Sequence, residues 1–294
     1  MKDFKAIFNT YSGKVKNSIG VKKEYGDKFI HGGYEDDSQW YYERMFFSKI
    51  SSLNFLNKYL SQKKFFSVLE IGCSIGLLPK FMKNVFDNVE YTGLDLSEKS
   101  LALAKQNFVD GNFIEGDFLQ LSLEQDFELI LSLDVIDHVY DPDAFLVKII
   151  QKTKKFGFIR AYRGYFDEID NHVTEYRTNE GIYLNNLSIK KIQAILEKNN
   201  ITKYQLLKSK SREKIFYDSD LGRKWKRSDS IERKKIMEFT GFNRELLENL
   251  PMDFQLSDEF IKKSKNKISS SFLGLPKSYD DISKNDHLTI IFEK

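Results

Sequence analysis

From Phe65 onward, apolar runs of strand length alternate with segments whose apolar residues recur at helical spacing. This alternation is typical of a parallel sheet whose strands are joined by crossover helices. Strands are predicted at 65–71, 89–94, 112–116, 127–135, 156–162, 201–208 and 287–292. We therefore expect an α/β fold with a doubly wound, mostly parallel seven-stranded sheet.

Capping residues mark three helix starts in this region. Ser97 and Ser188 each precede a segment of helical periodicity, and serine is a favoured N-cap. Asp141 is followed by Pro142, which combines a cap with the proline that suits the first helical position. The stretch between the fifth strand and Ser188, from Arg163 to Asn186, reads as a long polar connection.

The rest of the chain divides around this sheet. Residues 1–64 form an N-terminal extension with an amphipathic helix from about Trp40 to Leu60, and 65–210 together with 285–294 form the α/β domain. Residues 211–284 contain several helical segments between two strands. Loops of such length in compact domains are usually functional, so we expect a helical insertion near a substrate site.

The chain has a single cysteine, which excludes an internal disulfide, and no clustered Cys/His pattern predicts a metal. No apolar run approaches the ~20 residues that span a bilayer, and the N-terminus lacks a cleavable signal pattern. We expect a cytoplasmic protein with no membrane partner and no metal.

Charge is distributed unevenly along the chain. Residues 65–150 hold 15 acidic and 5 basic residues, a net charge of −10, whereas the whole chain carries +3. The acidic part suits a cationic ligand and the basic remainder an anionic substrate. A basic surface that is merely solvated is the alternative.

A glycine-bearing turn follows the first predicted strand, in the run Glu70-Ile71-Gly72-Cys73-Ser74-Ile75-Gly76. Glycine permits close backbone approach, and a following helix N-terminus offers N–H groups to an anion. Asp95 ends the second strand, where a carboxylate can accept hydrogen bonds from both hydroxyls of a ribose. Geometry alone also explains such glycines, but the combination favours a nucleoside ligand.

Four segments together resemble the class I S-adenosylmethionine-dependent methyltransferases over about residues 65–199. They are E-I-G-C-S-I-G, T-G-L-D-L-S-E-K-S-L-A-L-A, I-E-G-D-F and L-I-L-S-L-D-V-I-D-H-V-Y-D-P-D-A-F-L. The resemblance implies S-adenosylmethionine as cofactor and S-adenosylhomocysteine as product. One departure is Ser74, which replaces the middle glycine of the family's E-x-G-x-G-x-G pattern.

In that family the glycine turn faces the methionine part of the cofactor, an acid at the position of Asp95 holds the ribose and one at Asp117 binds the adenine amino group. The backbone at Phe118 borders the adenine ring. The resemblance thus predicts these cofactor-binding residues: Glu70, Gly72, Cys73, Gly76, Asp95, Leu96, Asp117, Phe118 and Leu133.

Two histidines are candidate general bases, because an alcohol acceptor needs its proton removed whereas a phosphate or carboxylate oxygen does not. His138 follows the fourth strand, where the resemblance places the reactive end of the cofactor. His172 lies in the connection that leaves the fifth strand. A packing histidine is the alternative at position 138.

Candidate substrate residues are Tyr25, His31, Arg44 and Tyr165. The first three belong to an aromatic and polar stretch near the N-terminus, and related enzymes use such a segment as a lid over cofactor and substrate. Arg44 would suit a carboxylate or phosphate, although it is equally suited to a surface.

The main hypothesis is O-methylation of a small molecule such as a sugar, a phosphorylated metabolite or a surface-glycan precursor. An RNA or nucleic-acid methyltransferase is one alternative, because residues 201–240 hold 12 basic and 6 acidic residues with interleaved aromatics. Against it, no base-amine motif or RNA-binding module is recognisable, so we expect no nucleic-acid partner. A non-catalytic S-adenosylmethionine-binding protein is the other alternative; a nicotinamide dehydrogenase lacks its third glycine here. A homo-oligomer stays open.

Overall fold

The computed structural model describes residues 67–76, 78–79, 82, 89–161, 165–166, 168–177, 182–209 and 287–294. The predicted N-terminal helix, the lid and the 211–284 insertion lie outside these residues. Their assignment as separate segments stays a prediction.

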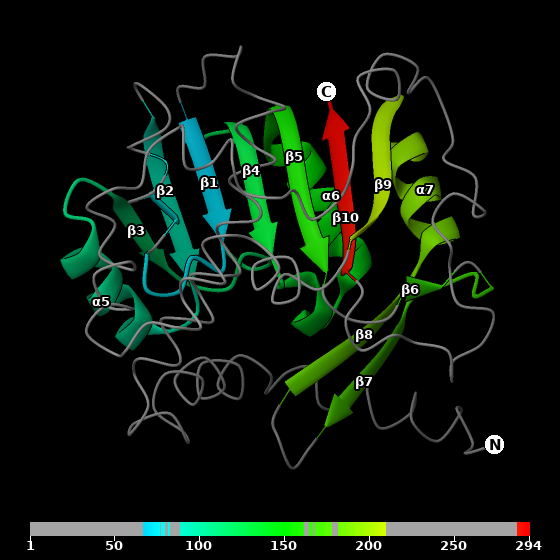
Figure 1. Ribbon diagram of the computed structural model, residues 1–294, viewed down its shortest axis with the longest axis horizontal. Coiled ribbons are helices and arrows are strands. Elements are labelled where there is room, and N and C mark those ends of the chain that lie inside the picture. The colour runs from blue at the N-terminus through cyan, green and yellow to red at the C-terminus, as the bar shows by residue number, and fades with distance from the viewer. Residues whose placement is uncertain are drawn as a thin grey trace, which may run out of the picture.

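Seven strands form the main sheet, in the order β3-β2-β1-β4-β5-β10-β9 (Figure 1). Their bounds are β1 Ser67–Ile71, β2 Glu90–Asp95, β3 Asn112–Glu115, β4 Phe127–Leu133, β5 Thr153–Ala161, β9 Lys203–Ser209 and β10 His287–Glu293. The first five strands in this order run parallel to one another. Strand β10 runs antiparallel to both β5 and β9. The predicted seven-stranded, mostly parallel sheet is confirmed.

Each of the three predicted helix starts is confirmed by its cap. Helix α5 (Glu98–Asn107) begins after Ser97, and helix α7 (Ile189–Lys198) begins after Ser188. Helix α6 (Pro142–Lys152) begins after Asp141, whose carboxylate accepts from the Ala144 amide at 2.9 Å. A side-chain acceptor at each start satisfies a backbone N–H that the helix itself cannot pair.

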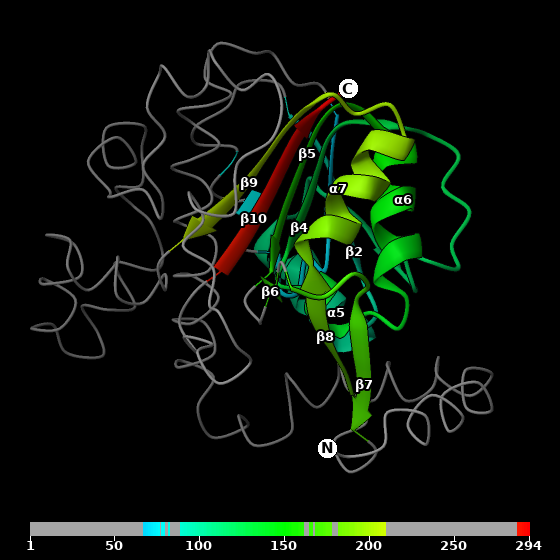
Figure 2. The ribbon, with the colours of Figure 1, turned by 90° about the vertical axis from the view of Figure 1, so that its right-hand side faces the viewer.

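Helices α6 and α7 cover one face of the sheet, side by side (Figure 2). Their apolar stripes point inward, which leaves charged residues on the outer face. The buried residues of these stripes are Phe145, Leu146, Ile149, Ile150, Ile189, Ile192, Ile195 and Leu196. They join apolar strand residues in one core. This packing holds the carboxyl ends of the parallel strands at a common edge.

The connection from Arg163 to Asn186 was expected to be a polar loop, and this expectation is wrong. It contains a second sheet of three strands, β6 (Tyr165–Phe166), β7 (Val173–Arg177) and β8 (Ile182–Ser188), in the order β6-β8-β7. Strand β8 is almost wholly buried in spite of its asparagines. Figure 1 shows this small sheet beyond the carboxyl ends of the parallel strands.

Within the described residues, no helix combines the length and the apolar character needed to cross a membrane.

Candidate functional site

The turn after β1 has a left-handed backbone at three positions, Gly72 (φ 73°), Ser74 (φ 52°) and Gly76 (φ 70°). The amides of Gly72 and Cys73 both donate to the carbonyl of Leu94, at 2.7 and 3.1 Å, which ties the turn to the end of β2. Left-handed conformations are easy for glycine and unfavourable for other L residues. Ser74 therefore adopts, at a cost, the geometry that the family's glycine would adopt freely.

Packing as well as backbone conformation requires the two glycines. A Cβ on Gly72 would lie 2.3 Å from Cγ2 of Val135, and one on Gly76 would lie 2.9 Å from Cβ of Ala104. The turn is thus pressed against the segment that follows β4 on one side and against α5 on the other. The Val135 contact places the segment 134–138 directly beside the glycine turn.

Asp95, at the carboxyl end of β2, connects the glycine turn to the N-cap of α5. Its Oδ2 accepts from the Ser74 amide at 2.8 Å, and its Oδ1 accepts from the Ser97 amide at 3.0 Å. A carboxylate has about four lone-pair positions, so two amide contacts are compatible with further hydroxyl donors. The structure fixes the orientation of the carboxylate that was predicted to hold a ribose.

Glu70 lies at the floor of the site and is completely buried. The Tyr91 hydroxyl, also buried, donates to Glu70 Oε2 at 2.5 Å. Burial raises the pKa of Tyr91 well above its usual value, and the neighbouring Glu70 raises it further. The phenol therefore stays protonated, which keeps a donor on a buried carboxylate.

Asp117 begins the loop after β3, where its Oδ1 accepts from the Leu119 amide at 3.0 Å. The next residue, Phe118, is buried and its ring meets Phe145 edge-on at 5.4 Å. Lys148, on α6, reaches under this loop: its Nζ donates to the carbonyls of Leu119 (3.2 Å) and Leu121 (2.6 Å). It also lies 5.2 Å from the Phe118 ring centroid.

Burial lowers the pKa of Lys148, while the charge of Asp117 acts in the opposite direction. The lysine thus anchors the backbone at the predicted adenine position. Neither this role nor the contact of Tyr140 with Gln120 was foreseen from the sequence. Helical periodicity predicts only that Lys148 lies on the polar side of its helix; it does not predict the contacts with the loop.

The three remaining predicted cofactor residues lie around the same edge. Cys73 is buried in the turn, and its sulfur occupies the space beside Gly93. Leu96 is half-buried between Asp95 and the cap of α5, and Leu133 is buried at the end of β4. All nine predicted cofactor residues thus belong to the loops and strand ends at the carboxyl edge of β1, β2, β3 and β4.

His138 ends the short 3₁₀ helix η2 (Ile136–His138) that follows β4. Its Nδ1 lies 2.9 Å from the carbonyl oxygen of Tyr183 on β8. His138 therefore stands between the segment that packs on the glycine turn and the small sheet.

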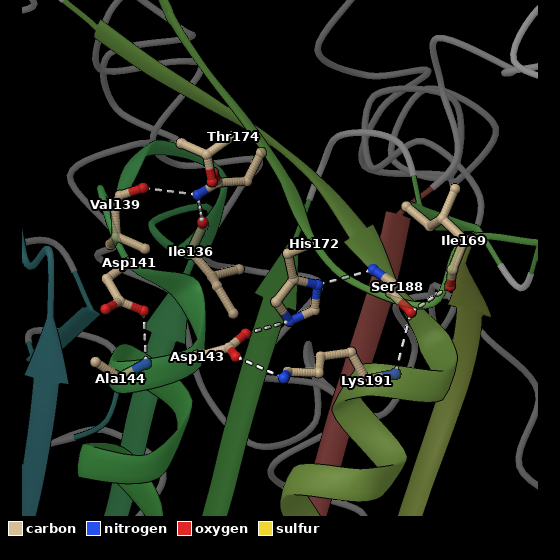
Figure 3. A network of polar contacts seen from close by, with 11 residues as sticks. Ile136, Val139, Asp141, Asp143, Ala144, Ile169, His172, Thr174, Ser188 and Lys191 are labelled. Atoms are coloured by element: carbon tan, nitrogen blue, oxygen red, sulfur yellow. Dashed lines mark hydrogen bonds and ion pairs between the residues drawn. The ribbon is translucent and has the colours of Figure 1, made fainter. Parts of the chain in front are cut away.

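His172 has different surroundings (Figure 3). Its Nδ1 accepts from the Ser188 amide at 2.8 Å, and its Nε2 lies 3.6 Å from Asp143 Oδ1. Asp143 also pairs with Lys191 at 2.9 Å. Burial lowers the pKa of His172 to about 4, although Asp143 opposes that shift. A neutral imidazole whose acceptor nitrogen is occupied by a backbone amide is suited to a structural role.

Of the predicted substrate residues, Tyr165 lies on β6 and is buried. Tyr25, His31 and Arg44 lie outside the described residues. Arg160 was not among the residues predicted for the site; it is 0% exposed on β5, and its Nε lies 3.7 Å from Asp134 Oδ1. The sequence signal for this residue is an arginine within the apolar run of the predicted strand 156–162. Asp134 has a left-handed backbone (φ 62°), which is uncommon for residues other than glycine.

Five acidic residues lie in the turns, strand ends and 3₁₀ helix along one edge: Glu70, Asp95, Asp117, Asp134 and Asp137. A cationic ligand with hydroxyl and amine donors matches these acceptors. The strand order, the glycine turn after β1 and the acid at the end of β2 together define a class I methyltransferase domain.

Comparison with known proteins agrees with this class. The family described as "Methyltransferase domain" matches residues 69–161. The ubiquinone biosynthesis O-methyltransferase of Mesorhizobium japonicum is 33% identical over 98 residues, which cover 31% of this chain and 38% of that protein. The malonyl-[acyl-carrier protein] O-methyltransferase of Priestia megaterium is 27% identical over 139 residues, or 46% of this chain and 48% of that protein.

The chain thus spans less than half the length of either curated relative. A solved structure of the plantazolicin methyltransferase BpumL, in complex with a substrate analog and SAH, has the same fold at 14% identity. It has a TM-score of 0.51 and covers 96% of this chain and 99% of that one. Residues 69–161 thus match a methyltransferase domain, and the described residues have the class I methyltransferase fold, whose cofactor is S-adenosylmethionine.

Proposed function

We propose that this protein transfers a methyl group from S-adenosylmethionine to an oxygen atom of a small molecule. The observation that carries the proposal is the Asp95 carboxylate, which two amides orient at the edge of the glycine turn. The proposed oxygen specificity rests on the two curated relatives, both of which are O-methyltransferases. A sugar, a phosphorylated metabolite or a surface-glycan precursor is the proposed type of acceptor.

The hydrogen-bond acceptors of the site suit the cofactor. Asp95 would accept from the ribose hydroxyls, and Asp117 would accept from the adenine amino group beside the Phe118 backbone. Glu70 lies behind the turn, and its negative charge favours a cation in the site. Leu96 and Leu133 would supply apolar contact to the nucleoside, and the turn from Gly72 to Gly76 would border the methionine part.

When bound, the cofactor supplies a methyl group on a positively charged sulfur, which is already electrophilic. The remaining task of the protein is to align the acceptor oxygen behind that methyl group and to exclude water. An alcohol or phenol acceptor also requires a base, for which His138 is the proposed residue. The buried position of His172 and the amide on its Nδ1 do not favour it for this role.

The candidate substrate residues Tyr25, His31, Arg44 and Tyr165 stay proposals. Arg44 would suit an anionic acceptor, and the buried hydroxyl of Tyr165 lies on a strand that leaves the carboxyl edge of β5.

The alternative of nucleic-acid methylation depends on residues 201–240, most of which lie outside the described part of the chain. No contact of the described residues favours it.

Calorimetric titration with S-adenosylhomocysteine and S-adenosylmethionine tests the cofactor assignment. We expect binding of both by the wild type and a rise in Kd of about 10-fold or more for Asp95→Asn, since a hydrogen bond to a charged group is worth about 1.5–3 kcal/mol. Asp170→Asn is the matched control, because Asp170 is exposed and pairs with Lys190 on the surface. The assignment is rejected if neither ligand binds the folded wild type at millimolar concentration.

The acceptor can be sought directly once binding is established. The enzyme is incubated with methyl-labelled S-adenosylmethionine and small-molecule extracts, and labelled products are identified by mass spectrometry. We expect label in an ether or ester that base or acid hydrolysis distinguishes. Label recovered only in RNA would support the nucleic-acid alternative instead.

A further inference from the structure

We propose that the small sheet β6-β8-β7 positions His138 as a base: strand β8 fixes the imidazole tautomer whose basic nitrogen is Nε2, and Asn185 holds the surrounding backbone in place. This inference rests on the proposed function and assigns a role to a sheet that the sequence did not foresee. It also commits the acceptor to a hydroxyl group.

Asn185, on β8, is completely buried, and its side-chain amide makes three hydrogen bonds. Its Nδ2 donates to the carbonyls of Ile136 at 2.7 Å and Val139 at 2.8 Å. Its Oδ1 accepts from the Thr174 hydroxyl at 2.6 Å, which fixes the amide orientation from β7. Figure 3 shows Ile136 and Val139 on one side of this network and Thr174 on the other. The backbone on both sides of His138 is therefore attached to the small sheet.

The ring of His138 is fixed by the same strand. Tyr183 stands two residues before Asn185, so both residues face the same side of β8. The Tyr183 carbonyl lies 2.9 Å from His138 Nδ1. A carbonyl only accepts, so the proton of the neutral ring stays on Nδ1 and the lone pair belongs to Nε2.

His172 is held in the opposite tautomer, also by β8. The Ser188 amide only donates, so His172 Nδ1 is the acceptor and the proton lies on Nε2, toward Asp143. The basic nitrogen of His172 is therefore already in use. Of the two candidate bases, only His138 has Nε2 as its basic nitrogen.

Methyl transfer to the hydroxyl oxygen, with His138 as base, needs no further reactant. As the acceptor oxygen forms its bond to the methyl carbon, the carbon–sulfur bond breaks and its electron pair stays on sulfur. The hydroxyl proton passes to His138 Nε2. The Tyr183 carbonyl then stabilises the imidazolium through Nδ1–H, in the manner of the groups that orient catalytic histidines elsewhere. A phosphate or carboxylate acceptor would not need this arrangement, which is why it indicates an alcohol or phenol.

The tautomers can be read by long-range ¹H–¹⁵N spectra of the full chain labelled with ¹⁵N-histidine. The chain has four histidines, and the His138→Gln and His172→Asn variants assign the two of interest. We expect a protonated Nδ1 and an unprotonated Nε2 in His138, and the reverse in His172. An Nε2–H tautomer of His138, or an average of the two forms, would overturn the inference.

Asn185→Leu tests the positioning role, with Ser188→Ala as the matched control. Ser188 is a buried polar residue of the same strand, but its hydroxyl contacts the Ile169 carbonyl and the Lys191 amide instead of the segment 136–139. We expect averaged tautomers for His138 in Asn185→Leu and an unchanged single tautomer in Ser188→Ala. A single Nδ1–H tautomer in both variants would remove Asn185 from the proposal.

If Asn185→Leu does not fold, Asn185→Ser provides the same comparison, because serine keeps one donor. The tautomer measurement does not depend on the proposed function, because it needs no acceptor. The titration with S-adenosylhomocysteine tests the proposed function separately. If S-adenosylhomocysteine binds but His138 has the Nε2–H tautomer, this inference alone is overturned. If both histidines have the expected tautomers but S-adenosylhomocysteine does not bind, the proposed function is overturned.

Discussion

Replacing His172 by asparagine should remove a large part of the acid sensitivity of the folded protein. Asparagine keeps a side-chain oxygen that can accept from the Ser188 amide, as His172 Nδ1 does at 2.8 Å. It does not titrate. The comparison therefore isolates the protonation of one buried ring from the loss of its hydrogen bond.

The magnitude follows from the pKa of His172 in the two states. Burial lowers this pKa to about 4 in the folded protein, from the usual 6.5 that applies to the unfolded chain. Between these values the unfolded chain binds more protons, so the free energy of unfolding falls as the pH falls. The stability is present above about pH 6.5 and is lost progressively toward about pH 4. From about pH 7 to about pH 4.5, the loss due to His172 is about 2 kcal/mol.

Urea unfolding of wild type and His172→Asn at about pH 7, 5.5 and 4.5 measures the difference. The unfolding free energy of the wild type should fall by about 1 kcal/mol more than that of the variant at about pH 5.5, and by about 2 kcal/mol more at about pH 4.5. The other titratable groups are the same in both proteins, so their contribution to the difference largely cancels. Parallel pH profiles would refute the buried, neutral state of His172.

Three further predictions concern the geometry of the turn and its neighbours. Ser74→Gly should raise the urea midpoint, by about 0.5–1 kcal/mol in unfolding free energy, because it relieves a left-handed φ of 52°; a lower midpoint would show that the hydroxyl is needed. Gly72→Ala should destabilise by about 2 kcal/mol or more through the clash with Val135, and Val135→Ala in the same chain should recover the steric part. Additive losses would disprove the clash. Lys148→Met should weaken S-adenosylhomocysteine binding about 3- to 10-fold in calorimetry by releasing the loop at Phe118; unchanged affinity would show that the loop keeps its shape without the lysine.

Local patterns were sufficient for the main sheet and its helix starts. Ser97, Asp141 and Ser188 cap helices as expected because capping depends on residues three positions apart. The small sheet was not predicted because its strands are short and rich in polar residues, so alternation gave no clear period. Asn185 looked like a loop residue, yet its amide is satisfied by carbonyls 46 and 49 residues earlier in the chain.

The same limit applies within the site. Sequence motifs offered both His138 and His172 as candidate bases, because a motif records residue type and not which ring nitrogen meets a donor. That distinction arises from two backbone groups of β8, the Tyr183 carbonyl and the Ser188 amide, whose chemical identity is the same in every sequence. Only the register of β8 against the segment after β4 decides which group meets which ring. A change that shifts this register by one residue would exchange carbonyl and amide positions and remove the basic Nε2 of His138, even with every site side chain retained.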